Sequence, residues 1–153
     1  MFKPALLIAC LALPLTAEAM SPRPGWQVLA TAKPYAALLS DLKDAVRAAK
    51  MGVVTEAGPT GAAASRGITI PGNRVVGVFR NDFAVRALAA SEAAMIEAPI
   101  RFYVTEDADG GATLSWKTPS HVFAPYADGG ADLQAVAREL DAIFAAIGAA
   151  AAR

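Results

Sequence analysis

The sequence predicts one small α+β domain, in which a mainly antiparallel sheet is covered on one face by helices. Segments with the periodicity of strands and helices follow one another in the order β-α-β-β-α-β-β-α. Two of the strands are joined by a short Gly-rich turn, which predicts an antiparallel hairpin. The length of 153 residues leaves room for one domain with a core of ordinary size.

The first elements are a strand, a helix and a second strand. Residues 26–31 predict the first strand, and residues 34–50 carry apolar side chains at helical spacing. Pro34 suits the first position of that helix, and Gly52 marks its end. Residues 53–56 then form the second strand. The apolar face of the helix consists of Leu38, Leu42, Ala45, Val46 and Ala49.

The middle of the chain predicts a connection, a strand and a helix. We interpret residues 58–67 as a flexible connection with room for a short helix across its Ala residues. Residues 74–80 form a strand that is apolar on both faces, which is typical of a central strand or of one whose second face meets a partner. Asn81 can cap a helix that extends to about residue 97.

The hairpin that follows is the clearest feature of the sequence. Pro99 ends the preceding helix, and residues 100–105 alternate between apolar and polar side chains. The turn Asp109-Gly110-Gly111 leads to a returning strand over residues 113–117, because glycine accepts positive φ without steric cost. With Phe102 and Trp116 facing inward, a second set of side chains projects from the opposite face of the hairpin. That set is Arg101, Tyr103, Ser115 and Lys117.

The last part of the chain predicts an irregular stretch and a long helix. The stretch extends from Thr118 to Gly130, and the helix starts near Asp132. Gly148 is expected to end the packed part of this helix, after which the Ala-rich tail frays. The apolar stripe of the helix is Leu133, Val136, Ala137, Leu140, Ile143, Phe144 and Ile147.

The N-terminus predicts a signal peptide. Lys3 supplies a positive start, an apolar stretch extends from Ala5 to Leu15, and Ala17-Glu18-Ala19 is a small-x-small cleavage site. Cleavage after Ala19 would leave a mature chain that starts at Met20 and locates to the bacterial periplasm. The alternative is a lipoprotein box ending at Cys10, which we favour less because the apolar run before Cys10 is very short and continues beyond it.

We assign four segments to the chain, of which the second and the third overlap at the first strand. They are a signal peptide (1–19), a lead-in with the first strand (20–33), a single α+β domain (26–148) and an Ala-rich tail (149–153).

Composition argues against several classes of function. Lys plus Arg and Asp plus Glu both number 14, and the pI of about 6.6 offers no field that would attract nucleic acid or an anionic membrane. The only Cys lies in the predicted signal peptide, so a mature chain has no disulfide, thiolate metal site or cysteine nucleophile. It also has no second long apolar run, so we expect no membrane span.

Two runs of the hairpin resemble a known family. They are Pro-Ile-Arg-Phe-Tyr-Val-Thr-Glu-Asp-Ala-Asp-Gly at residues 99–110 and Thr-Leu-Ser-Trp-Lys-Thr-Pro at residues 113–119. Together they are similar to the core signature of domain-of-unknown-function family 302, which has a Pro at a helix-to-strand junction, an acidic Glu-Asp-x-x-Gly hairpin and a strand ending in a small-residue-Pro step. Residues 76–81 are similar to the family's strand and Asn-capped helix.

The resemblance covers residues 35–147, with two departures from the family pattern. Asp82 replaces a Pro that is common after the capping Asn, and Ile100 replaces a Cys that many members carry. The resemblance implies a fold similar to those of TATA-box-binding-protein-like domains and a homodimer. It implies no reaction, and a shared fold does not transfer DNA binding to a neutral chain.

Four features of the sequence are candidates for sites of chemistry. His121 is the only His and is a candidate general base, although no Ser-His-acid spacing surrounds it. The acidic cluster of Glu106, Asp107 and Asp109 lacks the EF-hand pattern and suits a solvated hairpin. Residues 58–67, with Arg66, lack the Gly-Lys-Ser/Thr of a phosphate-binding loop. Met51 and Met95 lie near helix ends, have no His or Cys partner and suit a core, so we expect neither metal nor cofactor.

The outward set of the hairpin is the remaining candidate for a site. Arg101 and Lys117 beside Tyr103 could bind a small anion, although a solvated sheet face or a dimer interface explains the same pattern. We therefore predict a non-catalytic periplasmic domain that forms a homodimer or binds a small ligand through its uncovered sheet face. The alternatives are a hydrolase-type enzyme that uses His121 with a carboxylate, and an envelope interaction protein.

Overall fold

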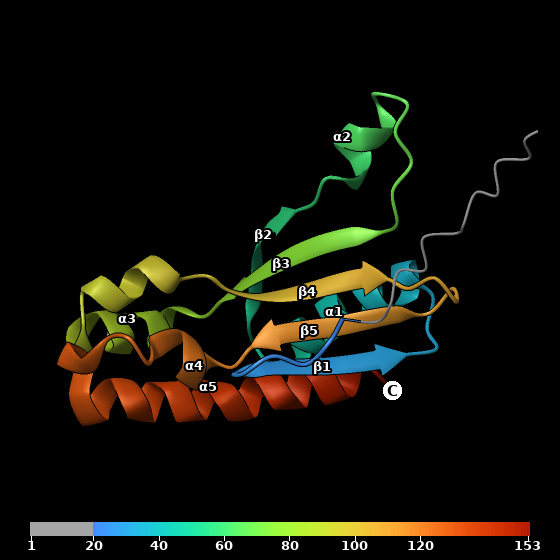
Figure 1. Ribbon diagram of the computed structural model, residues 1–153. Coiled ribbons are helices and arrows are strands. Elements are labelled where there is room, and N and C mark those ends of the chain that lie inside the picture. The colour runs from blue at the N-terminus through green and yellow to red at the C-terminus, as the bar shows by residue number, and fades with distance from the viewer. Residues whose placement is uncertain (1–19) are drawn as a thin grey trace, which may run out of the picture.

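The computed structural model describes residues 20–153, so the predicted signal peptide, with Cys10, lies outside the described residues. Five strands form one sheet in the order β1-β5-β4-β3-β2, and every pair of neighbours is antiparallel (Figure 1). This confirms the predicted fold class. The strands are β1 (Trp26–Thr31), β2 (Gly52–Ala57), β3 (Asn73–Phe79), β4 (Ile100–Glu106) and β5 (Ala112–Lys117).

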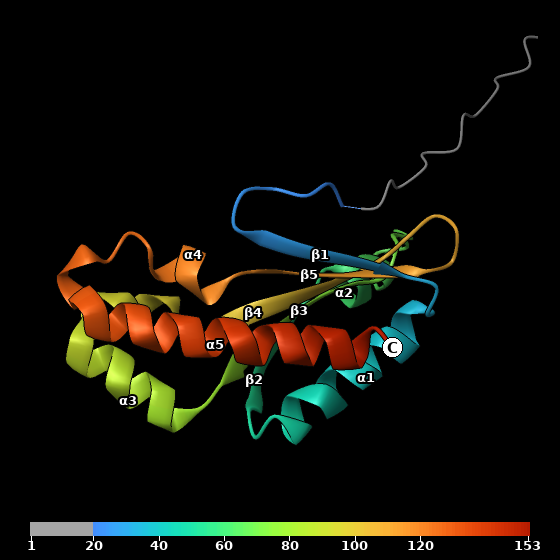
Figure 2. The ribbon, with the colours of Figure 1, turned by 90° about the horizontal axis from the view of Figure 1, so that it is seen from below.

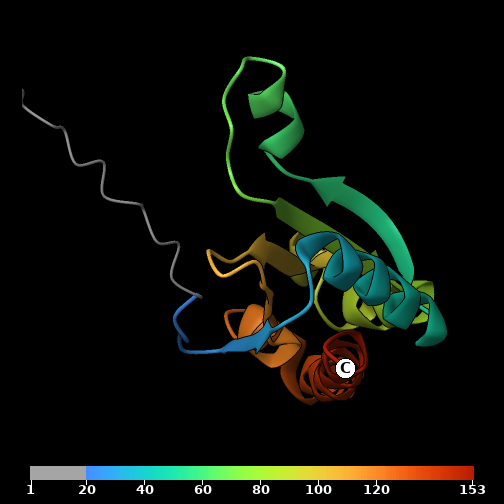
Figure 3. The ribbon, with the colours of Figure 1, turned by 90° about the vertical axis from the view of Figure 1, so that its right-hand side faces the viewer.

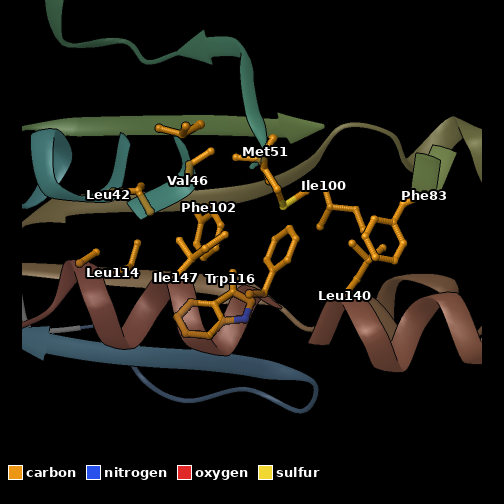
Figure 4. Packing of buried hydrophobic residues seen from close by; sticks show 14 of the residues in the cluster. Leu42, Val46, Met51, Phe83, Ile100, Phe102, Leu114, Trp116, Leu140 and Ile147 are labelled. Atoms are coloured by element: carbon orange, nitrogen blue, oxygen red, sulfur yellow. The ribbon is translucent and has the colours of Figure 1, made fainter. Parts of the chain in front are cut away.

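Helices α1 (Tyr35–Ala48) and α5 (Gly130–Ala151) cover one face of this sheet (Figure 2), and α3 (Asn81–Ala90) packs against α5 beyond the ends of the strands (Figure 1). Helix α1 buries Leu38, Leu42 and Val46, which recur every four residues and so share one side. Between the sheet and α5, the Phe102 ring stacks on Phe144 with 4.7 Å between centroids. Figure 4 shows Phe102 and Trp116 of the sheet beside Ile147 of α5. The inward residues of the hairpin therefore contact the helices, as the alternation predicts.

The helix that begins at Asn81 is shorter than predicted. It ends at Ala90, Ser91 is extended, and a 3₁₀ helix, η1 (Ala93–Glu97), follows. The Ser91 hydroxyl accepts a hydrogen bond from the Ala94 amide at 3.3 Å and donates one to Asp128. Serine competes with helical backbone bonds in this way, and its side chain starts a new turn here.

The C-terminal part also differs from the prediction. A short helix, α4 (Pro119–Phe123), occupies the stretch expected to be irregular, because the Thr118 hydroxyl caps it and Pro119 stands at its first position. A 3₁₀ turn, η2 (Ala127–Gly129), leads into α5. Helix α5 does not end at Gly148, and Ala151 is buried, with its carbonyl accepting a hydrogen bond from Lys33 Nζ at 2.8 Å. The expectation of a frayed tail was therefore wrong up to Ala151.

The connection between β2 and β3 contains the short helix α2 (Thr60–Ala64) and extends away from the helix layer (Figure 3). Its Ala residues are helical, as the sequence allowed. Within residues 20–153, no helix combines the length and the apolar character needed to cross a membrane.

Candidate functional site

The outward set of the hairpin lies on the sheet face opposite the helices. The register of β4 and β5 pairs Phe102 with Trp116 and Tyr103 with Ser115. Continuing this register places Arg101 across from Lys117. Because successive side chains of a strand point to opposite faces, the outward side chains are neighbours on one surface.

A hollow of about 590 Å³ opens on this face beside β4 and β5. It brings together three of the four predicted surface residues, Arg101, Tyr103 and Lys117, and also includes His121. The other residues around it are Trp26, Asn73, Val75, Glu97, Ile100, Phe102, Trp116, Val122 and Pro125.

Ser115 is the predicted surface residue that does not reach the hollow. Only 1% of its surface is exposed, and its hydroxyl lies 3.5 Å from the Met20 sulfur. The lead-in before β1 passes over the side of the sheet opposite the helices (Figure 2). This face is thus covered near Ser115 and hollowed beside Arg101.

The two cations of the hollow have different neighbours. The Lys117 ammonium lies 5.8 Å from the ring centroid of Trp26, which is its partner across β1 and β5. Arg23 of the lead-in lies at the same distance from that ring. Arg101 is exposed, and no described residue forms an ion pair with Arg101 or Lys117. Both charges therefore remain available to a ligand.

Tyr103 adds a neutral donor to the same wall. The Asn73 side-chain amide donates a hydrogen bond to Tyr103 Oη at 2.5 Å. With the oxygen accepting from Asn73, the hydroxyl hydrogen is free to donate to another group. The guanidinium, the ammonium and this hydroxyl are thus three hydrogen-bond donors carried by residues that line one hollow.

Glu97 and His121 lie at the end of the hollow beyond the strands. Tyr126 Oη donates to Glu97 Oε1 at 2.7 Å, and the carboxylate raises the pKa of Tyr126 because it stabilises the protonated phenol. The His121 side chain packs against Gly25, where a Cβ would lie 2.7 Å from His121 Cβ and closer still to the ring. Gly25 has a φ of +74°, so glycine is required there for two reasons.

The geometry assembles no Ser-His-acid arrangement around His121 in the described part of the chain. The backbone amide of His121 donates to Thr118 Oγ1 at 3.3 Å, but its imidazole makes no hydrogen bond to another described residue. The neighbouring Ser120 hydroxyl donates to Asp141 instead, and it lines a separate hollow of about 330 Å³. The hydrolase hypothesis gains no support from these contacts and stays a prediction.

Comparisons with known proteins support the resemblance seen in the hairpin. The model of the family described as "Domain of unknown function DUF302" matches residues 26–147. The chain belongs to this family. Its fold is similar to the crystal structure of an uncharacterized conserved DUF302 protein from Bacillus stearothermophilus, with a TM-score of 0.74 and 15% identity. The match covers 84% of this chain and 98% of the other. A comparison with curated proteins gave no match.

The carboxylates of the acidic cluster of this DUF302 domain accept hydrogen bonds within the hairpin and from the residue before β3. Glu106 accepts a hydrogen bond from the Gly72 amide at 2.6 Å, and Asp107 accepts one from the Thr113 hydroxyl at 2.7 Å. Asp109 accepts one from the Gly111 amide at 3.0 Å. Across residues 20–153, no group of three or more His, Cys, Asp or Glu side chains is placed to hold a metal ion.

Arg66 and the two methionines considered as metal or cofactor ligands do not line the hollow of the DUF302 domain. Arg66 is exposed in the connection between β2 and β3. Met51 is buried, and Met95 packs against the core, in keeping with their interpretation as core residues.

Sequence reasoning missed several residues of the hollow, among them Trp26, Asn73 and Glu97. The sequence predicts that Trp26 lies in a strand, but it does not predict which face of the sheet Trp26 occupies, because nothing in the sequence shows that β1 pairs with β5. The sequence pattern places Glu97 at the end of a long helix. For Asn73, the signal in the sequence is its position two residues before Val75, because residues two apart in a strand lie on the same face.

Proposed function

We propose that this DUF302 domain is a non-catalytic module that binds a small organic anion in the hollow on the second face of its sheet. The observation that carries the proposal is the convergence of Arg101, Lys117 and the Tyr103 hydroxyl on one hollow. Charge-assisted hydrogen bonds to a carboxylate are stronger than neutral ones, and a guanidinium can form two in parallel.

The size and the walls of the hollow suit a small molecule. Ligand pockets typically measure roughly 300–1,000 Å³ and combine apolar walls with a few polar groups, and this hollow measures about 590 Å³. Val75, Val122 and Pro125 supply apolar surface, and Trp26 supplies an aromatic ring. An anion with an apolar portion therefore fits better than a bare inorganic ion.

Titration with hexanoate tests the proposal on protein purified after expression of the full sequence. We expect saturable binding by calorimetry, with shifts of the Arg101 and Lys117 amides in NMR spectra. Arg101→Ala and Lys117→Ala should each weaken binding about tenfold or more, since a hydrogen bond to a charged group contributes about 1.5–3 kcal/mol. Arg66→Ala removes the same charge from a distant exposed site and should leave binding unchanged. Equal binding by all four proteins would refute the site.

The predicted homodimer competes for the same face. If two copies paired through the hollow, hexanoate would shift the protein toward the monomer, which sedimentation velocity can measure. A dimer that is indifferent to hexanoate would use another surface. The interaction with an envelope protein remains an alternative of the same kind.

We also infer that the domain acts in the periplasm, on the support of the N-terminal sequence alone. The positive start at Lys3, the apolar stretch and the Ala17-Glu18-Ala19 step support export. Intact mass of the purified protein tests this, because cleavage after Ala19 gives a chain that starts at Met20. A lipidated Cys10 would give a heavier product.

A further inference from the structure

The hollow carries charges of both signs that do not neutralise each other. Arg101 and Lys117 lie on the strands, whereas Glu97 lies at the end of η1. Among residues 20–153, neither cation has a nitrogen within 4.0 Å of a Glu97 oxygen. Opposite charges that share a hollow without pairing are complementary to a ligand that carries both signs.

Glu97 is positioned as an acceptor. Its Oε1 accepts the hydrogen bond from Tyr126, which orients the half-buried carboxylate. Its Oε2 accepts no hydrogen bond from the described part of the chain. A carboxylate has several lone-pair sites, so this oxygen can accept from an ammonium group.

The two charged ends are separated along the chain. Glu97 ends η1, whereas Arg101 lies in β4, and neither cation of the hollow has a nitrogen within 4.0 Å of a Glu97 oxygen in the described part of the chain. The apolar side chains of Val75, Val122 and Pro125 line the same hollow. A molecule whose charges lie several bonds apart fits this arrangement better than a compact one.

We infer that the ligand is a linear zwitterion of the ω-amino acid type. Its terminal carboxylate binds at Arg101 and Lys117, its apolar chain lies along the apolar side chains, and its terminal ammonium binds Glu97 Oε2. This inference rests on the proposed function, because it takes the anion site at the strands as given.

Three probes of equal chain length test the inference by calorimetry, namely 6-aminohexanoate, hexanoate and hexylamine. We expect 6-aminohexanoate to bind at least about tenfold more tightly than hexanoate, since a hydrogen bond between charged groups raises the affinity by about that factor. Hexylamine, which lacks the carboxylate, should bind more weakly than 6-aminohexanoate.

Glu97→Gln is the decisive variant. Its amide oxygen can still accept from Tyr126, but the negative charge is gone. We expect it to abolish the preference for 6-aminohexanoate while leaving hexanoate binding unchanged. Glu92→Gln, at an exposed carboxylate that does not line the hollow, should keep the preference.

The outcomes separate the two proposals. Suppose hexanoate binds and Arg101→Ala weakens it, but 6-aminohexanoate is no tighter or its preference survives Glu97→Gln. The zwitterion inference then fails, and the anion site stands. If neither compound binds, both proposals fail.

Discussion

Helix α5 passes so close to the sheet that Gly148 cannot accept even one methyl group. A Cβ built on Gly148 would lie 2.7 Å from Trp116 Cζ3 and closer still to Cη2, where ordinary contacts measure 3.4–4 Å. The Trp116 ring has little room to move, because it is 4% exposed and its centroid lies 5.4 Å from that of Phe102. Gly148→Ala must therefore displace either the helix or the ring.

Two opposing effects set the magnitude of this substitution. Alanine in a helix interior is favoured over glycine by about 1 kcal/mol. Overpacking a well-filled core costs about 1–3 kcal/mol, and a clash with a confined ring belongs in the upper part of this range. We expect Gly148→Ala to lower the free energy of unfolding by about 1–2 kcal/mol, against the helix propensity.

Urea unfolding followed by circular dichroism measures this difference. Gly61→Ala is the matched control, because Gly61 also lies in a helix but has nothing within 4 Å of a built Cβ. The control should keep or raise stability, by at most about 1 kcal/mol. If Gly148→Ala proved as stable as the natural protein, the close packing of α5 on Trp116 would be refuted.

Two further predictions concern the contacts of α3 and its continuation. Arg86 donates to both carboxylate oxygens of Glu139 at 2.7 and 2.8 Å, which holds the pKa of Glu139 below its ordinary 4.5. A lowered folded pKa contributes stability above pH 4.5 that is lost as the pH falls through the folded pKa. Glu139→Gln should therefore lower the melting temperature slightly at pH 7 and by less at pH 3, and an equal effect at both would contradict the pair. Ser91→Ala removes the hydrogen bond that the hydroxyl accepts from the Ala94 amide and the one that it donates to Asp128, and should cost about 1–2 kcal/mol in urea unfolding. Ser91→Thr, which keeps the hydroxyl, should recover part of that loss, and no recovery would argue against the hydrogen bonds.

The hairpin shows which side-chain positions the alternation of apolar and polar residues can predict and which it cannot. Alternation alone assigned Arg101, Tyr103 and Lys117 to one face, because a strand has two sides and the apolar side must meet the core. Alternation also assigned Ser115 to that face. It could not predict that Met20 would cover Ser115, because the path of a lead-in before the first strand follows no local pattern.

The structure contradicts two helix boundaries that the sequence predicted. Apolar spacing continued past Ala90, so the sequence predicted one helix where a single hydroxyl, Ser91, divides two. The sequence also predicts that the packed part of α5 ends at Gly148 and that the Ala-rich tail after it frays. Contacts with distant residues hold it instead, including the hydrogen bond from Lys33 to Ala151. Such long-range contacts are invisible to a pattern read along the chain.

Whether a side chain of the hollow also contacts other parts of the domain determines how clearly its substitution tests ligand binding. Arg101 and Lys117 are exposed and form no ion pair within residues 20–153, so their removal should change binding and leave stability nearly unaffected. Tyr103 is bonded to Asn73 across β3 and β4, so Tyr103→Phe removes a structural contact together with a ligand donor. A loss of binding in Tyr103→Phe is informative only beside Asn73→Ala, which breaks the same contact but keeps the phenol. If both variants lose binding equally, the hydroxyl positions the wall of the hollow, and the two cations alone hold the anion.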